Sequence, residues 1–155
     1  MKIEKGSRKE QRSEALERAE YVSELTGEGK WGKDGKEIPL EERKKLNVKF
    51  LEACHVYHGK NDLGMYLNPN IVVICTPLEH YVYHLFWVGR ADIIGLTEEE
   101  NNSAIKATFF RAKLYFKKRY RRKWEQLTYE EQQKIINRIK FYWSSRFAFP
   151  IQLES

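Results

Sequence analysis

All the histidines and cysteines of this 155-residue chain fall between positions 54 and 84. They are His55, His58, His80, His84, Cys54 and Cys75. Imidazole and thiol groups bind metal ions and exchange protons more readily than most other side chains. One fifth of the chain therefore holds every such group, and the fold of that segment decides whether they act together.

The segment is predicted to form two strands followed by a helix. Residues 50–56 and 71–75 are strand-like, and the loop between them, residues 59–70, is rich in glycine and asparagine. Pro77 stands where a helix can begin, and residues 78–88 are long enough for three turns. The segment is therefore expected to be a hairpin with a helix attached.

This arrangement predicts a metal site. His80 and His84 are four residues apart, so a helix projects both from one face, which suits two bonds to a single metal ion. Cys54 and His55 end the first strand, and Asn70 begins the second. The end of the first strand can therefore supply a third ligand across the hairpin.

The rest of the chain is predicted to be mainly helical. Before the hairpin we expect a helix over residues 7–26, a loop or tight hairpin over 27–35 and a short helix over 39–46. After it, the capping-box residues Thr97 and Thr128 predict the starts of two more helices. Apolar residues at helical spacing predict the core faces of these two helices: Ile105, Phe109, Ala112, Phe116, Tyr120, Ile135, Ile136, Ile139, Tyr142 and Trp143.

These elements predict an α+β fold in one mainly helical domain over residues 1–155. Its parts are an N-terminal segment of helix and loop (1–47), a central hairpin and helix (48–90) and basic C-terminal helices (97–155). Hydrophobic residues make up 41% of the chain and charged residues 32%, as in globular proteins. The longest apolar runs are too short to cross a bilayer and the start lacks a secretory signal, so a cytoplasmic protein with reduced cysteines is expected.

The net charge of +6 arises from one segment, residues 97–124, which carries nine basic and three acidic groups. The predicted nucleic-acid contacts are Lys106, Arg111, Lys113, Lys117, Lys118, Arg121 and Arg122. A concentrated positive segment on an otherwise neutral chain favours a polyanionic partner, with DNA ahead of RNA. Charge alone leaves a solvated helix face as an equal alternative. The oligomeric state is not readable from the sequence.

Three short stretches resemble the HNH nuclease motif. They are Leu51-Glu52-Ala53-Cys54-His55-Val56, Asn68-Pro69-Asn70-Ile71-Val72-Val73-Ile74-Cys75 and His80-Tyr81-Val82-Tyr83-His84. The family pattern is Leu-Glu-x-(His/Asp)-His-Ile, a loop, Asn-Leu-x-x-Leu-Cys and His-x-x-x-His. The resemblance covers about 35 residues in matching order and spacing. It implies a ββα-metal unit at the centre of the domain, in which a hairpin and a helix surround one divalent ion.

The resemblance also implies a role for each matched residue. His55 stands at the position of the general base that takes a proton from the attacking water, and Asn70 at that of the Asn that holds the base in place. Cys54, His80 and His84 stand at the metal-ligand positions. The implied activity is hydrolysis of phosphodiester bonds in DNA with Zn²⁺, Mg²⁺, Mn²⁺ or Ni²⁺. A bacterial or phage-infected cell is the expected setting.

Cys54 keeps a second interpretation open. Relatives usually have Asp or His at its position, and a thiolate is a soft ligand that favours zinc and weakens the Lewis acidity of the metal. Cys54 and Cys75 with His80 and His84 would also make a structural zinc site. The alternative function is therefore a non-catalytic nucleic-acid-binding protein with a structural or degenerate site.

Five nearby residues are weaker candidates. His58 and Asp62 are expected to face solvent, although either could touch the phosphate. Glu79, next to His80, could orient that ligand as a hydrogen-bond acceptor. Lys60 and Arg90 could contact the nucleic-acid backbone.

Overall fold

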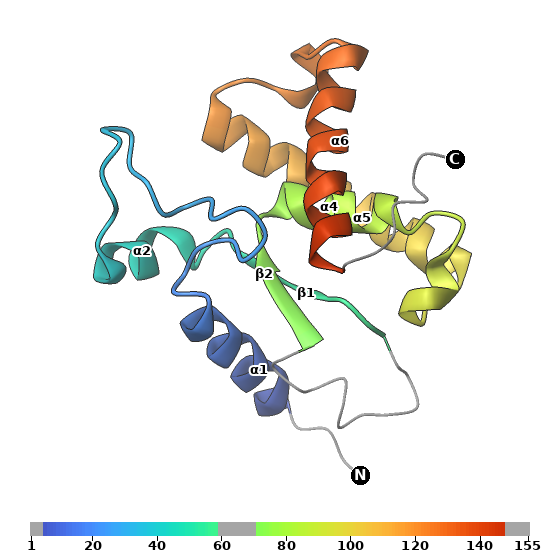
Figure 1. The fold of residues 1–155 in the computed structure, drawn as a ribbon, viewed down its shortest axis with the longest axis horizontal. Coiled ribbons are helices and arrows are strands. Elements are labelled where there is room, and N and C mark those ends of the chain that lie inside the picture. Colours follow the sequence, from blue (N-terminus) through green and yellow to red (C-terminus); the bar gives the residue numbers. More distant parts are fainter. Residues whose placement is uncertain (1–4, 59–70, 148–155) are drawn as a thin grey trace.

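The computed structural model of the chain describes residues 5–58 and 71–147, with side chains from residue 8 onward. Within these residues it is an α+β fold, mainly helical, with five α-helices around one two-stranded antiparallel hairpin (Figure 1). The elements are α1 (Lys5–Arg18), α2 (Leu40–Asn47), β1 (Glu52–His55), β2 (Val72–Cys75), α4 (Pro77–Phe86), α5 (Glu98–Tyr120) and α6 (Tyr129–Arg146). Short 3₁₀ helices lie at Ala91–Ile94 and Trp124–Gln126.

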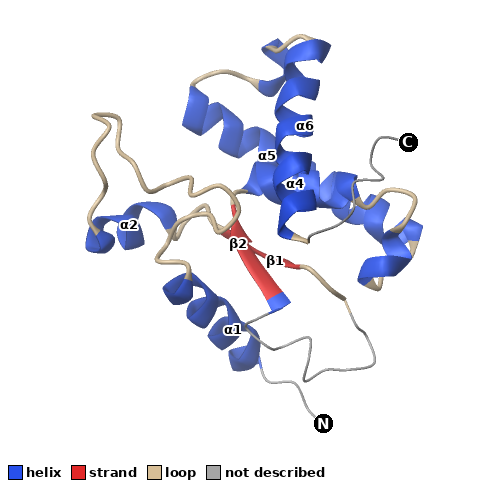
Figure 2. Cartoon of the chain, in the orientation of Figure 1, coloured by secondary structure: helices blue, strands red, loops and turns tan. Residues whose placement is uncertain are grey.

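The hairpin lies between α1 and α4 (Figure 2). All four residues of β2 are buried, whereas in β1 only Cys54 is. β1 and β2 pair so that Glu52 is opposite Cys75 and His55 is opposite Val72. Alternate side chains of a strand point to opposite faces. Cys54 and Cys75 therefore join the core under α4, while Ile74 joins a second core under α1.

α4 follows β2 directly and is the central helix of the fold. Thr76 caps its N-terminus by accepting a hydrogen bond from the Glu79 backbone N–H, and Pro77 fits the first turn, where no N–H donor is needed. α5 and α6 both pack on α4. The indole N–H of Trp143, from α6, donates to the backbone oxygen of Glu79 at 2.9 Å.

The helices of the C-terminal half begin where the sequence predicts. Thr97 with Glu100, and Thr128 with Glu131, form complete capping boxes at the starts of α5 and α6. Most of the predicted core residues on these helices are buried or packed against the core. Ile105 and Tyr142 are half-buried, and Tyr120, at the last turn of α5, is 45% exposed.

The first helix is shorter than predicted. It ends at Arg18, because Glu20 and Tyr21 take positive φ angles of 54° and 59° and turn the chain back toward the hairpin. Glu24 then covers the outer edge of β2. Its backbone N–H donates to the Ile74 oxygen at 2.7 Å, and its carboxylate accepts from the Ile74 N–H at 2.9 Å. The apolar residues after Arg18 thus belong to a turn that closes the sheet edge, which helical periodicity alone does not reveal.

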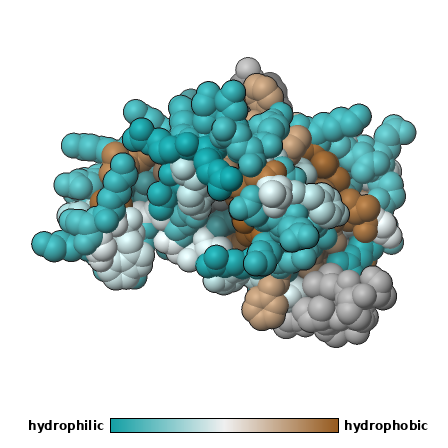
Figure 3. Space-filling model, turned by 90° about the horizontal axis from the view of Figure 1, so that it is seen from above, coloured by the Kyte–Doolittle hydropathy of each residue, from teal (hydrophilic) through white to brown (hydrophobic). Residues whose placement is uncertain are grey.

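The surface in Figure 3 is mainly hydrophilic, with small hydrophobic areas between polar side chains. No helix in the described part of the chain combines the length and the apolar character that a membrane span needs.

Candidate functional site

A cavity of about 620 Å³ borders β1, between α1 on one side and α4 and α5 on the other. We call it the histidine cleft. Three imidazoles line it, from His55, His58 and His80. Its walls also carry four cationic side chains, Arg8, Lys9, Arg12 and Arg111, and one carboxylate, Glu52. The cleft therefore combines proton-exchanging groups with an excess of positive charge.

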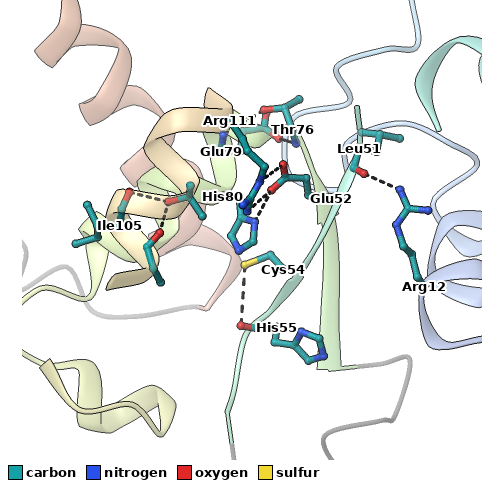
Figure 4. Close-up of polar contacts among 12 residues, drawn as sticks. Arg12, Leu51, Glu52, Cys54, His55, Thr76, Glu79, His80, Ile105 and Arg111 are labelled. Carbon is teal, nitrogen blue, oxygen red and sulfur yellow. Dashed lines mark hydrogen bonds and ion pairs between the residues drawn. The ribbon is translucent and has the colours of Figure 1, made fainter. Parts of the chain in front are cut away.

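Glu52 connects the hairpin to α4 and α5 (Figure 4). Its Oε1 lies 2.7 Å from His80 Nδ1, and its Oε2 accepts a hydrogen bond from Arg111 Nε at 2.8 Å. Burial alone would raise the pKa of Glu52, but the hydrogen bonds from His80 and Arg111 outweigh it and lower the pKa below its ordinary value. Glu52 thus stays ionised and fixes the orientation of the His80 ring.

Cys54 and His80 form a charged pair beside Glu52. Burial opposes ionisation of the Cys54 thiol, but hydrogen bonds with Cys75 and His80 lower its pKa to about 6. Burial also opposes a charge on His80, yet the Cys54 thiolate and Glu52 raise its pKa to about 9. The two groups are coupled, and each favours the charged form of the other. Figure 4 shows the Cys54 sulfur beside the His80 ring.

His84 is held by Asn101. The Asn101 amide donates to the His84 backbone oxygen at 3.0 Å, which leaves Asn101 Oδ1 as the atom 2.9 Å from His84 Nδ1. Because Oδ1 can only accept, Nδ1 must donate, and Nε2 carries the free lone pair. Burial, followed by the charge on His80, lowers the pKa of His84 to about 4. His84 is thus neutral, with Nε2 in the form that binds metal ions.

His55 points to the opposite side of β1 from Cys54 (Figure 4). Its Nε2 lies 3.2 Å from Gln11 Oε1 on α1. Burial, then the charges of His58 and Arg8, lower the pKa of His55 to about 4. The imidazole is therefore neutral throughout the physiological range, although it is a weaker base than an unperturbed histidine.

His58 does not simply face solvent, as the sequence suggested. It is half-buried, and its ring centroid lies 6.0 Å from that of His55 and 6.3 Å from that of His84. The His80 and His84 rings are 5.3 Å apart. The four imidazoles thus follow one another in the order His55, His58, His84, His80.

The described residues do not assemble a metal site as they stand. Across residues 5–58 and 71–147, no three histidine, cysteine, aspartate or glutamate side chains are grouped closely enough to hold an ion. The predicted ligand set of Cys54, His80 and His84 therefore stays a prediction. Cys54 is hydrogen-bonded to His80, and the His84 ring lies next to the His80 ring. Its chemistry, one sulfur and two imidazoles, suits a zinc-like ion.

Other predicted residues have mixed outcomes. Asn70, Lys60 and Asp62 lie outside the described residues. The Glu79 carboxylate accepts from the Ser23 hydroxyl and the Thr76 N–H, so Glu52, not Glu79, orients His80. Arg90 lies on the ring of Phe86 and donates to its backbone oxygen.

The cations predicted to contact nucleic acid are divided between two places. Arg111 reaches the histidine cleft, whereas Lys113 pairs with Glu125 at 3.2 Å. The others are exposed on α5 and just beyond it: Lys106, Lys117, Lys118, Arg121 and Arg122. The α1 cations of the cleft were missed because nearby acidic residues cancel them in the net charge. The sequence feature that could have identified them is the four-residue spacing of Arg8 and Arg12, which puts both on one helix face.

Comparisons of the chain with protein-family models, with curated proteins and with solved structures gave no match.

Proposed function

We propose that this protein is a nuclease that hydrolyses phosphodiester bonds in the histidine cleft. DNA is the first substrate to test. The observation that carries the proposal is the lining of the cleft, where His55, His58 and His80 stand among four cationic side chains. Arginine and lysine bind phosphate oxygens, and neutral imidazole accepts protons from water. The resemblance to the HNH motif implies a general base at His55 and a metal ligand at His80.

In this proposal the cleft binds the backbone and His55 starts the reaction. Arg8, Lys9 and Arg111 neutralise the phosphate and hold it against β1. His55 is neutral and takes the proton of the attacking water as that water bonds to phosphorus. The electron pair of the breaking P–O bond leaves with the departing oxygen.

The residues that would hold a divalent ion are Cys54, His80 and His84, and of these His80 also lines the cleft. When bound, the ion would supply positive charge to the leaving oxygen. Glu52 orients the His80 ring from Nδ1, as carboxylates do for metal-binding histidines, and Asn101 does the same for His84. His80 would release its proton, which it holds against the Cys54 thiolate, to act as a ligand.

The test is plasmid cleavage in a panel of metals. Supercoiled DNA is incubated with the protein in EDTA and in Mg²⁺, Mn²⁺, Ni²⁺ or Zn²⁺, and nicked and linear products are counted. We expect cleavage in at least one metal and none in EDTA. Activity equal in wild type and His55→Ala in every metal would refute the proposal, and so would the absence of cleavage in all of them.

A matched variant separates catalysis from packing. Gln11 contacts His55 but has no acid–base chemistry, so Gln11→Ala should retain most of the activity that His55→Ala loses. Thermal unfolding of both variants shows whether each is folded.

The second candidate is a nucleic-acid-binding protein with a structural zinc site. The observation that favours it is the contact between the Cys54 and Cys75 thiols in the core under α4, which puts a second sulfur next to a candidate ligand. Metal coordination distinguishes the two. Four protein ligands including Cys75 would support the structural site, while three ligands and a water would support the enzyme. X-ray absorption of the zinc- or nickel-loaded protein, with Cys75→Ser for comparison, counts the sulfur ligands.

A further inference from the structure

A second and larger cavity, of about 800 Å³, lies between the loop after α1, the end of α5 and α6. These three segments can be followed in Figure 1. We call it the α5–α6 cavity. Its volume is in the range of sites for small molecules. It shares no lining residue with the histidine cleft.

The floor of the α5–α6 cavity is apolar, and at its rim exposed cations outnumber the one exposed carboxylate, Glu131. Leu78, Phe116 and Ile139 are buried lining residues. The exposed cations around the opening are Arg119, Arg122, Lys134 and Arg138. Aromatic rings line it as well: Trp31, Tyr115, Tyr120 and Tyr142. Stacking rings combined with cations are the features with which proteins hold nucleotides.

Two buried polar atoms of lining residues lack a hydrogen-bond partner among the described residues. They are Glu28 Oε2 and the Tyr115 hydroxyl. Arg119 Nε lies 3.4 Å from Glu28 Oε2, and the Tyr120 hydroxyl lies 3.4 Å from Oε1, so both contacts are long. Buried polar groups are nearly always hydrogen-bonded, and exceptions call for a ligand or another explanation.

The chemistry of these two groups selects the ligand. A carboxylate accepts hydrogen bonds, and a pair of adjacent N–H donors matches its two oxygens. The Watson–Crick edge of guanine presents such a pair, N1–H and the N2 amino group, beside the O6 acceptor. Adenine and cytosine offer a single amino donor on that edge, and uracil offers one imide N–H.

We propose that the α5–α6 cavity binds a guanine nucleotide, with the base edge on Glu28, the ring against the aromatic lining and the phosphate among the rim cations. Arg119 and Tyr120, whose side chains are exposed and make only long contacts with Glu28, move aside when the base enters. The nucleotide is either free or an unpaired residue of a strand. The proposal does not depend on cleavage in the histidine cleft.

Calorimetric titration of the intact protein tests this, with GMP, AMP, CMP, UMP and inorganic phosphate as separate ligands. We expect the dissociation constant of GMP to be at least tenfold below all the others. No GMP binding, or equal binding of the four nucleotides, would overturn the proposal. A single-stranded oligothymidine with one central guanine, set against oligothymidine alone, distinguishes the two sources. Tighter binding of the guanine strand than of GMP indicates a residue of a strand, and the reverse indicates the free nucleotide.

Glu28→Gln is the decisive variant, because it keeps the shape of the side chain but replaces one acceptor by a donor. It should raise the dissociation constant of GMP at least tenfold and leave that of AMP within about twofold. Glu37→Gln makes the same chemical change on an exposed side chain that does not line the cavity, and it should bind GMP as wild type does. Unchanged GMP affinity in folded Glu28→Gln would refute the role of Glu28 and with it the proposal. Both variants are also compared on the His55→Ala background, where differences in cleavage cannot affect the measured dissociation constants.

Discussion

Glu52 and His80 are joined by a contact of 2.7 Å that ties the first strand of the hairpin to the central helix. The second oxygen of the same carboxylate binds Arg111, on α5. One side chain therefore holds three elements together and sets the orientation of a candidate ligand. It also lies against two cationic groups, the largely buried His80 ring and the exposed Arg111 guanidinium.

Replacing Glu52 by Ala should destabilise the protein by about 1–3 kcal/mol, because it leaves His80 and Arg111 without their shared acceptor. Urea denaturation measures the change. Glu125→Ala, which breaks an exposed pair with Lys113, should leave the denaturation midpoint unchanged. An equal effect of the two substitutions would mean that the Glu52 contacts are ordinary surface pairs.

Trp143→Ala should cost about 3–5 kcal/mol of unfolding free energy, since it empties a fully buried site and removes the hydrogen bond to the Glu79 backbone oxygen. Phe141, two residues earlier, is 65% exposed, and Phe141→Ala should change stability by less than about 0.5 kcal/mol. Thermal melts of the two variants compare them directly. A small loss for Trp143→Ala would show that α6 is not fixed to α4 by this contact.

The hairpin and the three well-capped helices could be predicted because their signals are local. Strand-like runs and the Thr–Glu boxes at Thr97 and Thr128 act within a few residues. The end of α1 could not, because the turn after Arg18 is fixed by hydrogen bonds between Glu24 and Ile74, which are fifty residues apart in the chain. The α+β fold class could be predicted from these local signals alone.

The candidate site was predictable in its residue types and less so in its contacts. Ligand spacing placed His80 and His84 on one helix, and the structure has them there with rings 5.3 Å apart. The partners that orient them, Glu52 and Asn101, come from β1 and α5, so no short-range pattern identifies them. His58 was assigned to solvent because its burial depends on the packing of the 3₁₀ segment that ends at Ile94.

Glu28→Gln should stabilise the folded protein at neutral pH. Burial, then the charge on Glu79, raise the pKa of Glu28. Between the ordinary carboxyl pKa and the raised one, the unfolded chain has released its proton while the folded chain keeps it, so stability falls as pH rises through that interval. The gain in melting temperature of Glu28→Gln should be present at pH 7 and vanish below pH 4. A variant less stable than wild type at pH 7 would contradict the conclusion that the ionised Glu28 carboxylate destabilises the folded protein.

The exposed cations at the end of α5 should contribute to DNA binding. Changing Lys117, Lys118, Arg121 and Arg122 to Ala should weaken binding at low salt, and the slope of log K against log salt should fall by about 0.9 for each phosphate that the variant no longer neutralises. Fluorescence anisotropy of a labelled duplex measures both. If affinity and slope survive, this face is merely solvated. Lys9→Ala, in the histidine cleft, then tests whether the DNA follows α1 instead.

The central claim is that His55 activates water in the histidine cleft, and single-turnover cleavage tests it most directly. A labelled duplex is cut with protein in excess, in the metal that supports the fastest plasmid cleavage. Loss of a general base should slow the chemical step by about 10²–10⁴-fold in His55→Ala, with DNA affinity unchanged. Imidazole added to the solution should restore part of the rate to the variant and none to wild type. A variant that cleaves as fast as wild type, or whose lost rate imidazole does not restore at all, would contradict the role assigned to His55.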